Sequence, residues 1–183
     1  MKGEWKTRGR CHVYGDDIAH DNGLMEWQHI IGRQTDPTVL IPCLLAAIDP
    51  QFTQRVQPGD FLIAGRRFGT GKAHTTAYVG MEALGLRVLC ESTFERVIRG
   101  AANLGMPIMG QCPGITSVLR TGDEIEVDMS TGDVTKTQTG EHFTYAPIPS
   151  GLRQIIADGG RKGFLEKWLA AHPELAQPMD PQA

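Results

Sequence analysis

A glycine-rich turn between an apolar run and a helical pattern constrains the fold of this chain more than any other feature of its sequence. The apolar run covers residues 61–64, and the turn, residues 65–75, has the sequence GRRFGTGKAHT. Apolar residues then recur at helical spacing, at Ala73, Ala77, Met81 and Leu84. We therefore expect a buried strand, a glycine turn and a helix that begins near Lys72.

Such a turn can bind an anion, because the first amides of a helix point outward and carry the positive end of its dipole. Gly69 and Gly71 would allow the anion to approach the backbone closely. A Walker phosphate loop is disfavoured, because it has four residues between its glycine and the Gly-Lys pair and then Ser or Thr. Here five residues separate Gly65 from Gly71, and Ala73 follows Lys72. A tight strand-to-helix turn without a ligand is the alternative.

The spacing of apolar residues along the chain predicts an α/β fold. Residues 86–90 form a second apolar run, and strand, helix and strand in so short a span predict a parallel crossover. Residues 1–8 are polar, and we expect them to be loose. The other expected elements are a strand at 10–14, a helix at 94–104, a β-hairpin at 124–139, and short helices at 24–31, 150–156 and 164–169.

Length and charge exclude several classes of protein. The 183 residues suit a single domain, with a core at about residues 9–170 and a tail from Pro173 that we expect to be disordered. A net charge of -3 and the lack of a basic run give no sign of the basic surface that binds nucleic acid. The sequence shows no signal-like N-terminal segment and no apolar run that could cross a bilayer, so we expect a cytoplasmic protein.

The cysteines lie far apart in the sequence. They lack the paired spacing of a zinc or iron–sulfur site. We therefore expect no metal site in this chain and four free thiols, at Cys11, Cys43, Cys90 and Cys112.

Several segments occur in an order that resembles a known family. They are residues 9–21, 60–65, 68–71, 83–88, 92–96 and 103–107. Together they are similar to the small subunit of 3-isopropylmalate dehydratase, the swivelling domain of the aconitase-type hydro-lyases. The resemblance covers about residues 9–130 and implies a three-layer β/β/α swivelling domain with a partly parallel sheet.

The resemblance also implies a function. It suggests the small subunit of a heteromeric hydro-lyase that dehydrates or isomerises a hydroxy di- or tricarboxylic acid. The [4Fe-4S] cluster that acts as Lewis acid on the leaving hydroxyl would lie in a large partner subunit, and this chain would hold no cofactor. The chain would be active only with that subunit. The alternative is a non-catalytic module that binds a carboxylate or phosphate metabolite at the glycine turn.

The chain departs from the family pattern directly after the second glycine of the turn. There the family continues Ser-Ser-Arg-Glu-His, in which the first serine is the catalytic base and the arginine binds a substrate carboxylate. Here the five residues are Lys72, Ala73, His74, Thr75 and Thr76. Both the serine base and the arginine are therefore missing.

Three interpretations of this departure remain open. Lys72 could replace serine as the catalytic base, because a helix N-terminus and partial burial would both lower its pKa. Alternatively, Lys72 could stay charged and bind a substrate carboxylate together with Arg66 or Arg67. In the third interpretation the subunit has no chemistry of its own.

Other residues near the turn are candidates for substrate binding. The resemblance places Asp21 in the active site, where it would help to position catalytic groups, although His20 replaces the preceding threonine. Thr70, with Gly69 and Gly71, could donate hydrogen bonds at the mouth of the site. His74 could donate to a carboxylate when protonated, or could be an ordinary polar residue of the first helical turn. Arg96 and Asn103 are expected to support the fold or the subunit boundary.

Overall fold

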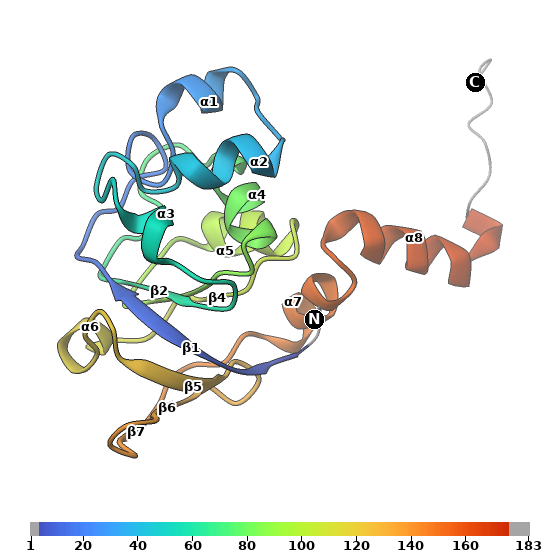
Figure 1. Ribbon diagram of the computed structural model, residues 1–183. Coiled ribbons are helices and arrows are strands. Elements are labelled where there is room, and N and C mark those ends of the chain that lie inside the picture. Colours follow the sequence, from blue (N-terminus) through green and yellow to red (C-terminus); the bar gives the residue numbers. More distant parts are fainter. Residues whose placement is uncertain (1–3, 176–183) are drawn as a thin grey trace.

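The computed structural model describes residues 4–175, which form a mixed α/β fold around a seven-stranded sheet of order β4-β3-β2-β1-β5-β6-β7 (Figure 1). Strands β1 to β4 pair in parallel, whereas β1, β5, β6 and β7 pair in antiparallel fashion. The partly parallel sheet predicted from the sequence is therefore confirmed. The strands are β1 (Lys6–Val13), β2 (Phe61–Ala64), β3 (Arg87–Cys90), β4 (Ile108–Met109), β5 (Glu124–Asp128), β6 (Asp133–Lys136) and β7 (His142–Thr144).

The two halves of the sheet differ in burial, as their sequences predict. All four residues of β2 are buried, which is typical of a parallel strand covered on both faces. In β5, buried Ile125 and Val127 alternate with half-buried polar residues, as in an antiparallel strand with one face toward the core. The sheet therefore needs cover on both faces of its parallel half and on one face of its antiparallel half.

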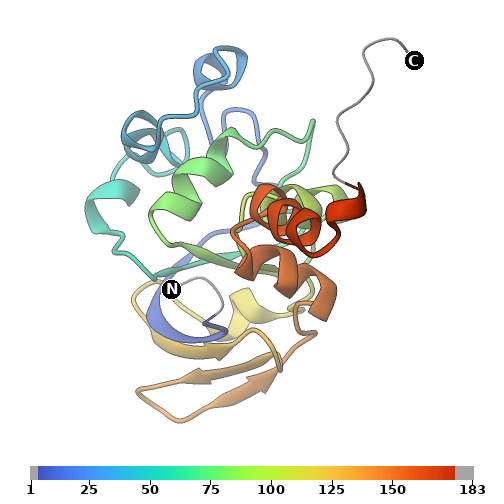
Figure 2. The same cartoon turned by 90° about the vertical axis from the view of Figure 1, so that its right-hand side faces the viewer.

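Helices and a curled sheet supply this cover in three layers. Figures 1 and 2 show helices α1 to α5 on one side of the parallel strands and strands β5 to β7 on the other. Two apolar cores fill the spaces, and Phe61 and Ile63 of the parallel half pack with Ile125 and Val127 of the antiparallel half in the second. The predicted β/β/α architecture is thus confirmed. The helices are α1 (Trp27–Ile31), α2 (Pro37–Leu40), η1 (Ile41–Cys43), α3 (Phe52–Arg55), α4 (Thr76–Ala83), α5 (Glu95–Ala102), α6 (Ile115–Val118), α7 (Ser150–Ala157), α8 (Arg161–Ala171) and η2 (Pro173–Leu175).

Two expectations at the ends of the chain need correction. Residues 6–8 are not loose, because Lys6 and Arg8 lie in β1 and form ion pairs with Glu126 and Glu124 of β5. The tail expected to be disordered from Pro173 begins with the short helix η2. Residues 1–3 and 176–183 lie outside the described part of the chain.

The helix after the glycine turn begins later than expected. Helix α4 starts at Thr76, and the carbonyl of Thr75 accepts its first hydrogen bonds, from Tyr78 at 3.0 Å and Val79 at 3.3 Å. Gly71, the residue before Lys72, has a φ of +85°, which lies outside the helical region. The helix therefore cannot extend back to Gly71. Lys72 therefore lies in a loop and not in the first turn of a helix.

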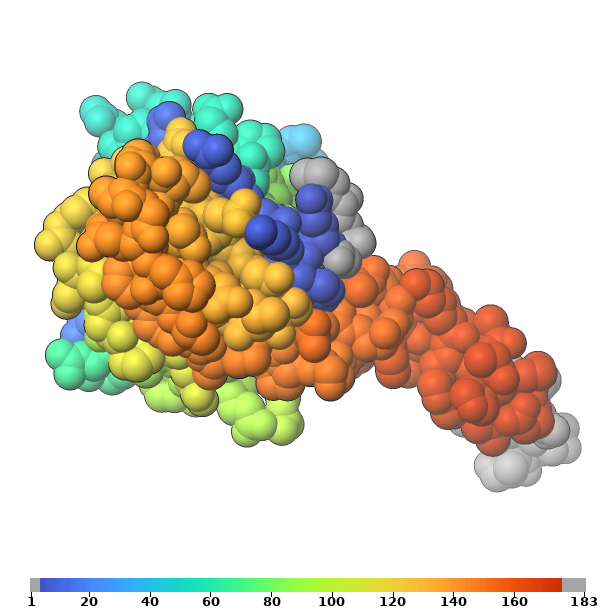
Figure 3. All heavy atoms as spheres, turned by 90° about the horizontal axis from the view of Figure 1, so that it is seen from below, coloured from blue at the N-terminus to red at the C-terminus, as the bar shows by residue number. Residues whose placement is uncertain are grey.

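Helix α8 projects away from the body of the molecule (Figures 1 and 3). Its apolar side chains Leu165, Trp168 and Leu169 are exposed, and the helix buries none of its residues. No described helix is long and apolar enough to cross a membrane.

Candidate functional site

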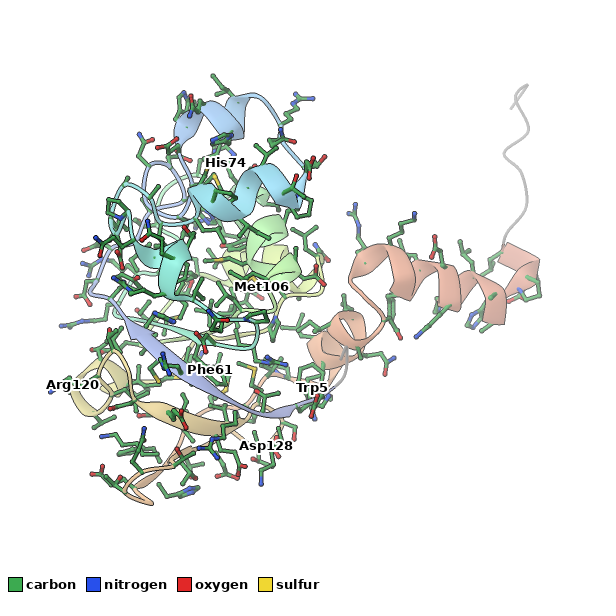
Figure 4. All side chains as sticks on the ribbon, in the orientation of Figure 1. Trp5, Phe61, His74, Met106, Arg120 and Asp128 are labelled. Atoms are coloured by element: carbon green, nitrogen blue, oxygen red, sulfur yellow. The ribbon has the colours of Figure 1, made fainter. Side chains whose placement is uncertain are left out.

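The glycine turn lies at the carboxyl edge of the parallel strands. It follows β2 directly and meets the segments that follow β1 and β3, through isolated bridges between Thr70 and Ala19 and between Phe68 and Thr93. In open α/β sheets this edge is where ligands bind. Figure 4 shows His74, from the end of the turn, at the side of the molecule occupied by α1 and α2, far from Asp128 in the antiparallel half.

The backbone amides of residues 65–69, in the first part of the turn, are already bonded inside the protein. We call residues 65–70 the anchored half. The amides of Gly65 and Gly69 donate to carbonyls of the loop after β1, and that of Phe68 donates to a carbonyl after β3. The recorded bonds are Gly65 to Gly15 (3.0 Å), Arg66 to Asp16 Oδ1 (2.7 Å), Arg67 to Ser92 Oγ (3.1 Å), Phe68 to Ser92 (3.0 Å) and Gly69 to Ile18 (2.8 Å). These amides are not free to bind an anion, which corrects the expectation for this part of the turn.

The two arginines of the anchored half are paired with aspartates. Arg67 donates to both carboxylate oxygens of Asp17, at 2.6 Å from Nε to Oδ1 and through Nη2 to Oδ2. This hydrogen bonding holds the pKa of Asp17 below its ordinary value. Arg66 Nε lies 3.5 Å from Asp16 Oδ2. Arg67 would have to leave Asp17 in order to bind a substrate carboxylate, and Arg66 already has the opposite charge of Asp16 beside it.

The second part of the turn is free of such bonds. We call residues 71–75 the open half. Within residues 4–175, no acceptor is in hydrogen-bonding geometry with the amides of this half. Gly71, Lys72, Ala73 and Thr75 are exposed, and only His74 is half-buried. An anion could therefore reach these amides from solvent.

Lys72 is exposed and forms no hydrogen bond or ion pair with any described residue. It precedes the first residue of α4, Thr76, by four positions, and the influence of a helix dipole is confined to about the first turn. Partial burial and a helix N-terminus, both expected from the sequence, are therefore not found around Lys72 in this chain by itself.

Asp21 and His74, which the sequence selected separately, lie together. His74 Nε2 is 3.4 Å from Asp21 Oδ1, within ion-pair distance but not in hydrogen-bonding geometry, and neither atom has a hydrogen-bond partner among the described residues. The Trp27 ring packs edge-on against His74 at 5.9 Å between ring centres. This pair joins the open half to the segment that follows β1.

His20 lies directly beneath the anchored half, and sequence reasoning did not select it. Its side chain is 1% exposed, its amide donates to the Thr70 carbonyl at 3.2 Å, and Nε2 lies 3.2 Å from the Tyr78 hydroxyl. Burial above all, and then the nearby charge of His74, lower the pKa of His20 to about 4. The imidazole is therefore neutral at pH 7 and supports the turn as a packing residue.

Arg96, expected to support only the fold or a boundary, reaches the open half from α5. Its Nη2 donates to the Gly71 carbonyl at 3.1 Å, and its guanidinium carbon lies 4.3 Å from the centre of the Phe94 ring. One signal in the sequence could have pointed to Arg96. It follows the predicted strand at β3, and consecutive parallel strands end at the same edge of a sheet.

The cysteines do not form a metal site. Cys11, Cys90 and Cys112 are buried and Cys43 is half-buried, and burial raises the pKa of the Cys11 and Cys112 thiols to about 12. No group of three His, Cys, Asp or Glu residues in the described part of the chain could hold a metal ion. The residues present therefore do not fit an iron–sulfur cluster.

Comparison with known proteins gives consistent matches over most of the chain. No protein-family model matches the sequence. The 3-isopropylmalate dehydratase small subunit of Moorella thermoacetica is 32% identical over 161 residues, which are 87% of this chain and 95% of the relative. The corresponding small subunit 1 of Methanopyrus kandleri is 35% identical over 157 residues, 84% of this chain and 88% of the relative.

A relative and a solved structure from Methanocaldococcus jannaschii also match. The isopropylmalate/citramalate isomerase small subunit of this organism is 29% identical and covers 89% of this chain and 95% of the relative. The crystal structure of a 3-isopropylmalate dehydratase superposes with a TM-score of 0.82 and 27% identity, covering 92% of this chain and 98% of that one.

Proposed function

This chain belongs to the family of 3-isopropylmalate dehydratase small subunits, and from that premise we propose that it is the small subunit of a heteromeric aconitase-type hydro-lyase. A small subunit implies a large one. We propose that the large subunit carries a [4Fe-4S] cluster, which would supply Lewis-acid chemistry at the leaving hydroxyl. The proposed substrate is a hydroxy di- or tricarboxylic acid, in keeping with the hydroxy dicarboxylates named for two of the relatives.

The open half is the observation that supports this proposal most directly. Its free amides, exposed Lys72 and half-buried His74 lie at the carboxyl edge of the parallel strands. Amides and cations that converge on one place stabilise a carboxylate and the negative charge that develops on it when the neighbouring carbon loses a proton. A face open to solvent also leaves room for a large subunit to complete the site.

We assign Lys72 as the base that takes the proton from the carbon alpha to a substrate carboxylate. A lysine works as a base only when its neutral form is favoured, and desolvation has this effect. Docking of the large subunit over the open half would supply this desolvation. Asp21 would hold His74 in place, and His74 would donate to a carboxylate oxygen.

The test is to purify the chain together with the large subunit of the same organism and to assay a panel of hydroxy di- and tricarboxylates. We expect dehydratase activity in the complex, and we expect Lys72→Ala to lower kcat by roughly 100-fold or more, as for loss of a general base. Full activity in this variant would remove Lys72 from the mechanism.

A second variant separates the two roles that Lys72 could have. Lys72→Arg keeps the charge but cannot release a proton at neutral pH. If Lys72 is the base, this variant should be as inactive as Lys72→Ala. If Lys72 only binds a carboxylate, the variant should keep substantial activity. If the complex is inactive on every acid while the isolated chain binds dicarboxylates tightly in calorimetry, the chain is a binding module and the proposed function is wrong.

A further inference from the structure

The open half lacks a guanidinium from its own segment of the chain. His74 stands where the family resemblance places an arginine, and Arg66 and Arg67 of the anchored half are paired with Asp16 and Asp17. A carboxylate bound at the open half therefore needs an arginine from another element if it is to be held in a bidentate manner.

Arg96 is the arginine that the fold brings to this place. It lies at the second position of α5, and its hydrogen bond to the Gly71 carbonyl holds the guanidinium at the edge of the open half. The Phe94 ring beneath it limits the conformations that the side chain can adopt. A side chain held in this way loses little conformational freedom when it binds a ligand.

Most of the hydrogen-bonding capacity of Arg96 is unused. A guanidinium has five N–H donors, and Arg96 directs one bond to Gly71 and has no carboxylate partner among the described residues. Arg99, one turn further along α5, is instead paired with Glu95. The unused donors are thus available to a ligand.

We propose that Arg96 binds a carboxylate of the substrate at the open half, alongside the free amides of residues 71–75. This inference rests on the proposed function and names the residue that recognises one carboxylate of the acid. It makes Arg96 a determinant of specificity, since an acid that lacks that carboxylate gains nothing from the guanidinium.

The test uses the complex with the large subunit and the dicarboxylate that it turns over. We compare Arg96→Gln, Arg96→Lys and the control Arg99→Gln, each with the dicarboxylate and with its two monoamides. We expect Arg96→Gln to lower kcat/KM for the dicarboxylate by roughly 10- to 100-fold, as for loss of a hydrogen bond to a charged group. With one of the monoamides the same variant should match the wild type within about 2-fold, because the contacted charge is already absent.

Arg96→Lys should lose most of the same activity, because lysine cannot bind bidentately, and Arg99→Gln should behave as the wild type. Equal losses of Arg96→Gln with the dicarboxylate and both monoamides would mean that Arg96 only shapes the turn, and this result would overturn the inference. An unchanged kcat/KM of Arg96→Gln for the dicarboxylate would overturn the inference as well.

A failure of the proposed function is distinguishable from a failure of this inference. If the wild-type complex turns over no acid, calorimetry of the complex with 3-isopropylmalate still compares the wild type with Arg96→Gln. Weaker binding in the variant would support Arg96 as the carboxylate-binding residue even without turnover. Equal binding would overturn the inference, and no binding to the wild type would overturn both proposals.

Discussion

The anchored half and the open half of the glycine turn are adjacent in sequence but opposite in structure. In residues 65–69, every backbone amide has an acceptor in the protein, whereas the amides of residues 71–75 have none within the described chain. Gly65, Phe68 and Gly69 of the anchored half are buried, whereas no residue of the open half is. One turn therefore combines a structural segment that joins three loops with a segment that is available to a ligand.

The glycines of the two halves have different roles for the same reason. A Cβ atom added at Gly69 would lie 2.7 Å from Val97 Cγ2 and 3.1 Å from His20 Nε2, whereas a Cβ atom at Gly71 would meet nothing within 4 Å. Both residues have positive φ, of +71° and +85°. Gly69 is thus required by conformation and by space, and Gly71 by conformation alone.

The largest expected effect on stability follows from this difference. Gly69→Ala adds a steric clash to the strain of a left-handed alanine, so we expect the free energy of unfolding to fall by about 2–5 kcal/mol. Gly71→Ala is the matched control and should lose only about 1 kcal/mol, from backbone strain. Urea unfolding of both variants measures the difference. Equal losses would show that the anchored half is not packed as described.

A smaller effect should come from the buried histidine beneath the anchored half. An unfolded imidazole takes up a proton near pH 6.5, whereas His20 in the fold does so near pH 4. Between these values the unfolded state binds more protons, so stability is lost as the pH falls from 6.5 toward 4. We expect this residue to contribute about 2 kcal/mol to that loss.

The variant His20→Gln tests this expectation, because glutamine does not titrate. Its free energy of unfolding should depend less on pH between 6.5 and 4 than that of the wild type. Carboxylates titrate in the same range in both proteins, so the difference between the two pH profiles is the quantity to measure. Parallel profiles would mean that His20 can be protonated in the folded protein without loss of stability.

The smallest expected effect is on the open half. Lys72→Met should change the free energy of unfolding by no more than about 0.5 kcal/mol, because the side chain is exposed and bonds to no described residue. Thermal unfolding of the isolated chain checks this value. A clear loss of stability would contradict the division of the turn, and it would also complicate the use of Lys72 variants in activity assays.

Sequence patterns predicted the scaffold well where local residues decide it. The buried run at β2, the helix α5 and the alternating strand β5 were all expected. A strand buried on both faces, a helix buried along one stripe and a strand buried on one face each leave a distinct spacing of apolar residues. The start of α4 was misplaced, because Ala73 continues the apolar spacing of the helix although the backbone is not helical at Gly71.

The candidate site was predicted only in part. The glycine turn, Asp21 and His74 were selected, and the structure places the last two 3.4 Å apart. His20 and Arg96 were not selected as site residues. Nothing in the sequence around them shows that His20 lies against Gly69 or that Arg96 bonds to Gly71.

The sequence by itself determined the longer strands and helices, the turn between β2 and α4, and the family to which the chain is similar. It did not predict the short elements α2, α3, β4, α6 and β7. Only the tertiary structure decided which amides of that turn are free, and which arginines are paired. The physical reason is that hydrogen bonds between loops depend on residues about 25 to 50 positions apart, such as Arg67 with Asp17 and Arg96 with Gly71. Local propensity carries no information on such pairs, so the binding part of the turn becomes visible only in the fold.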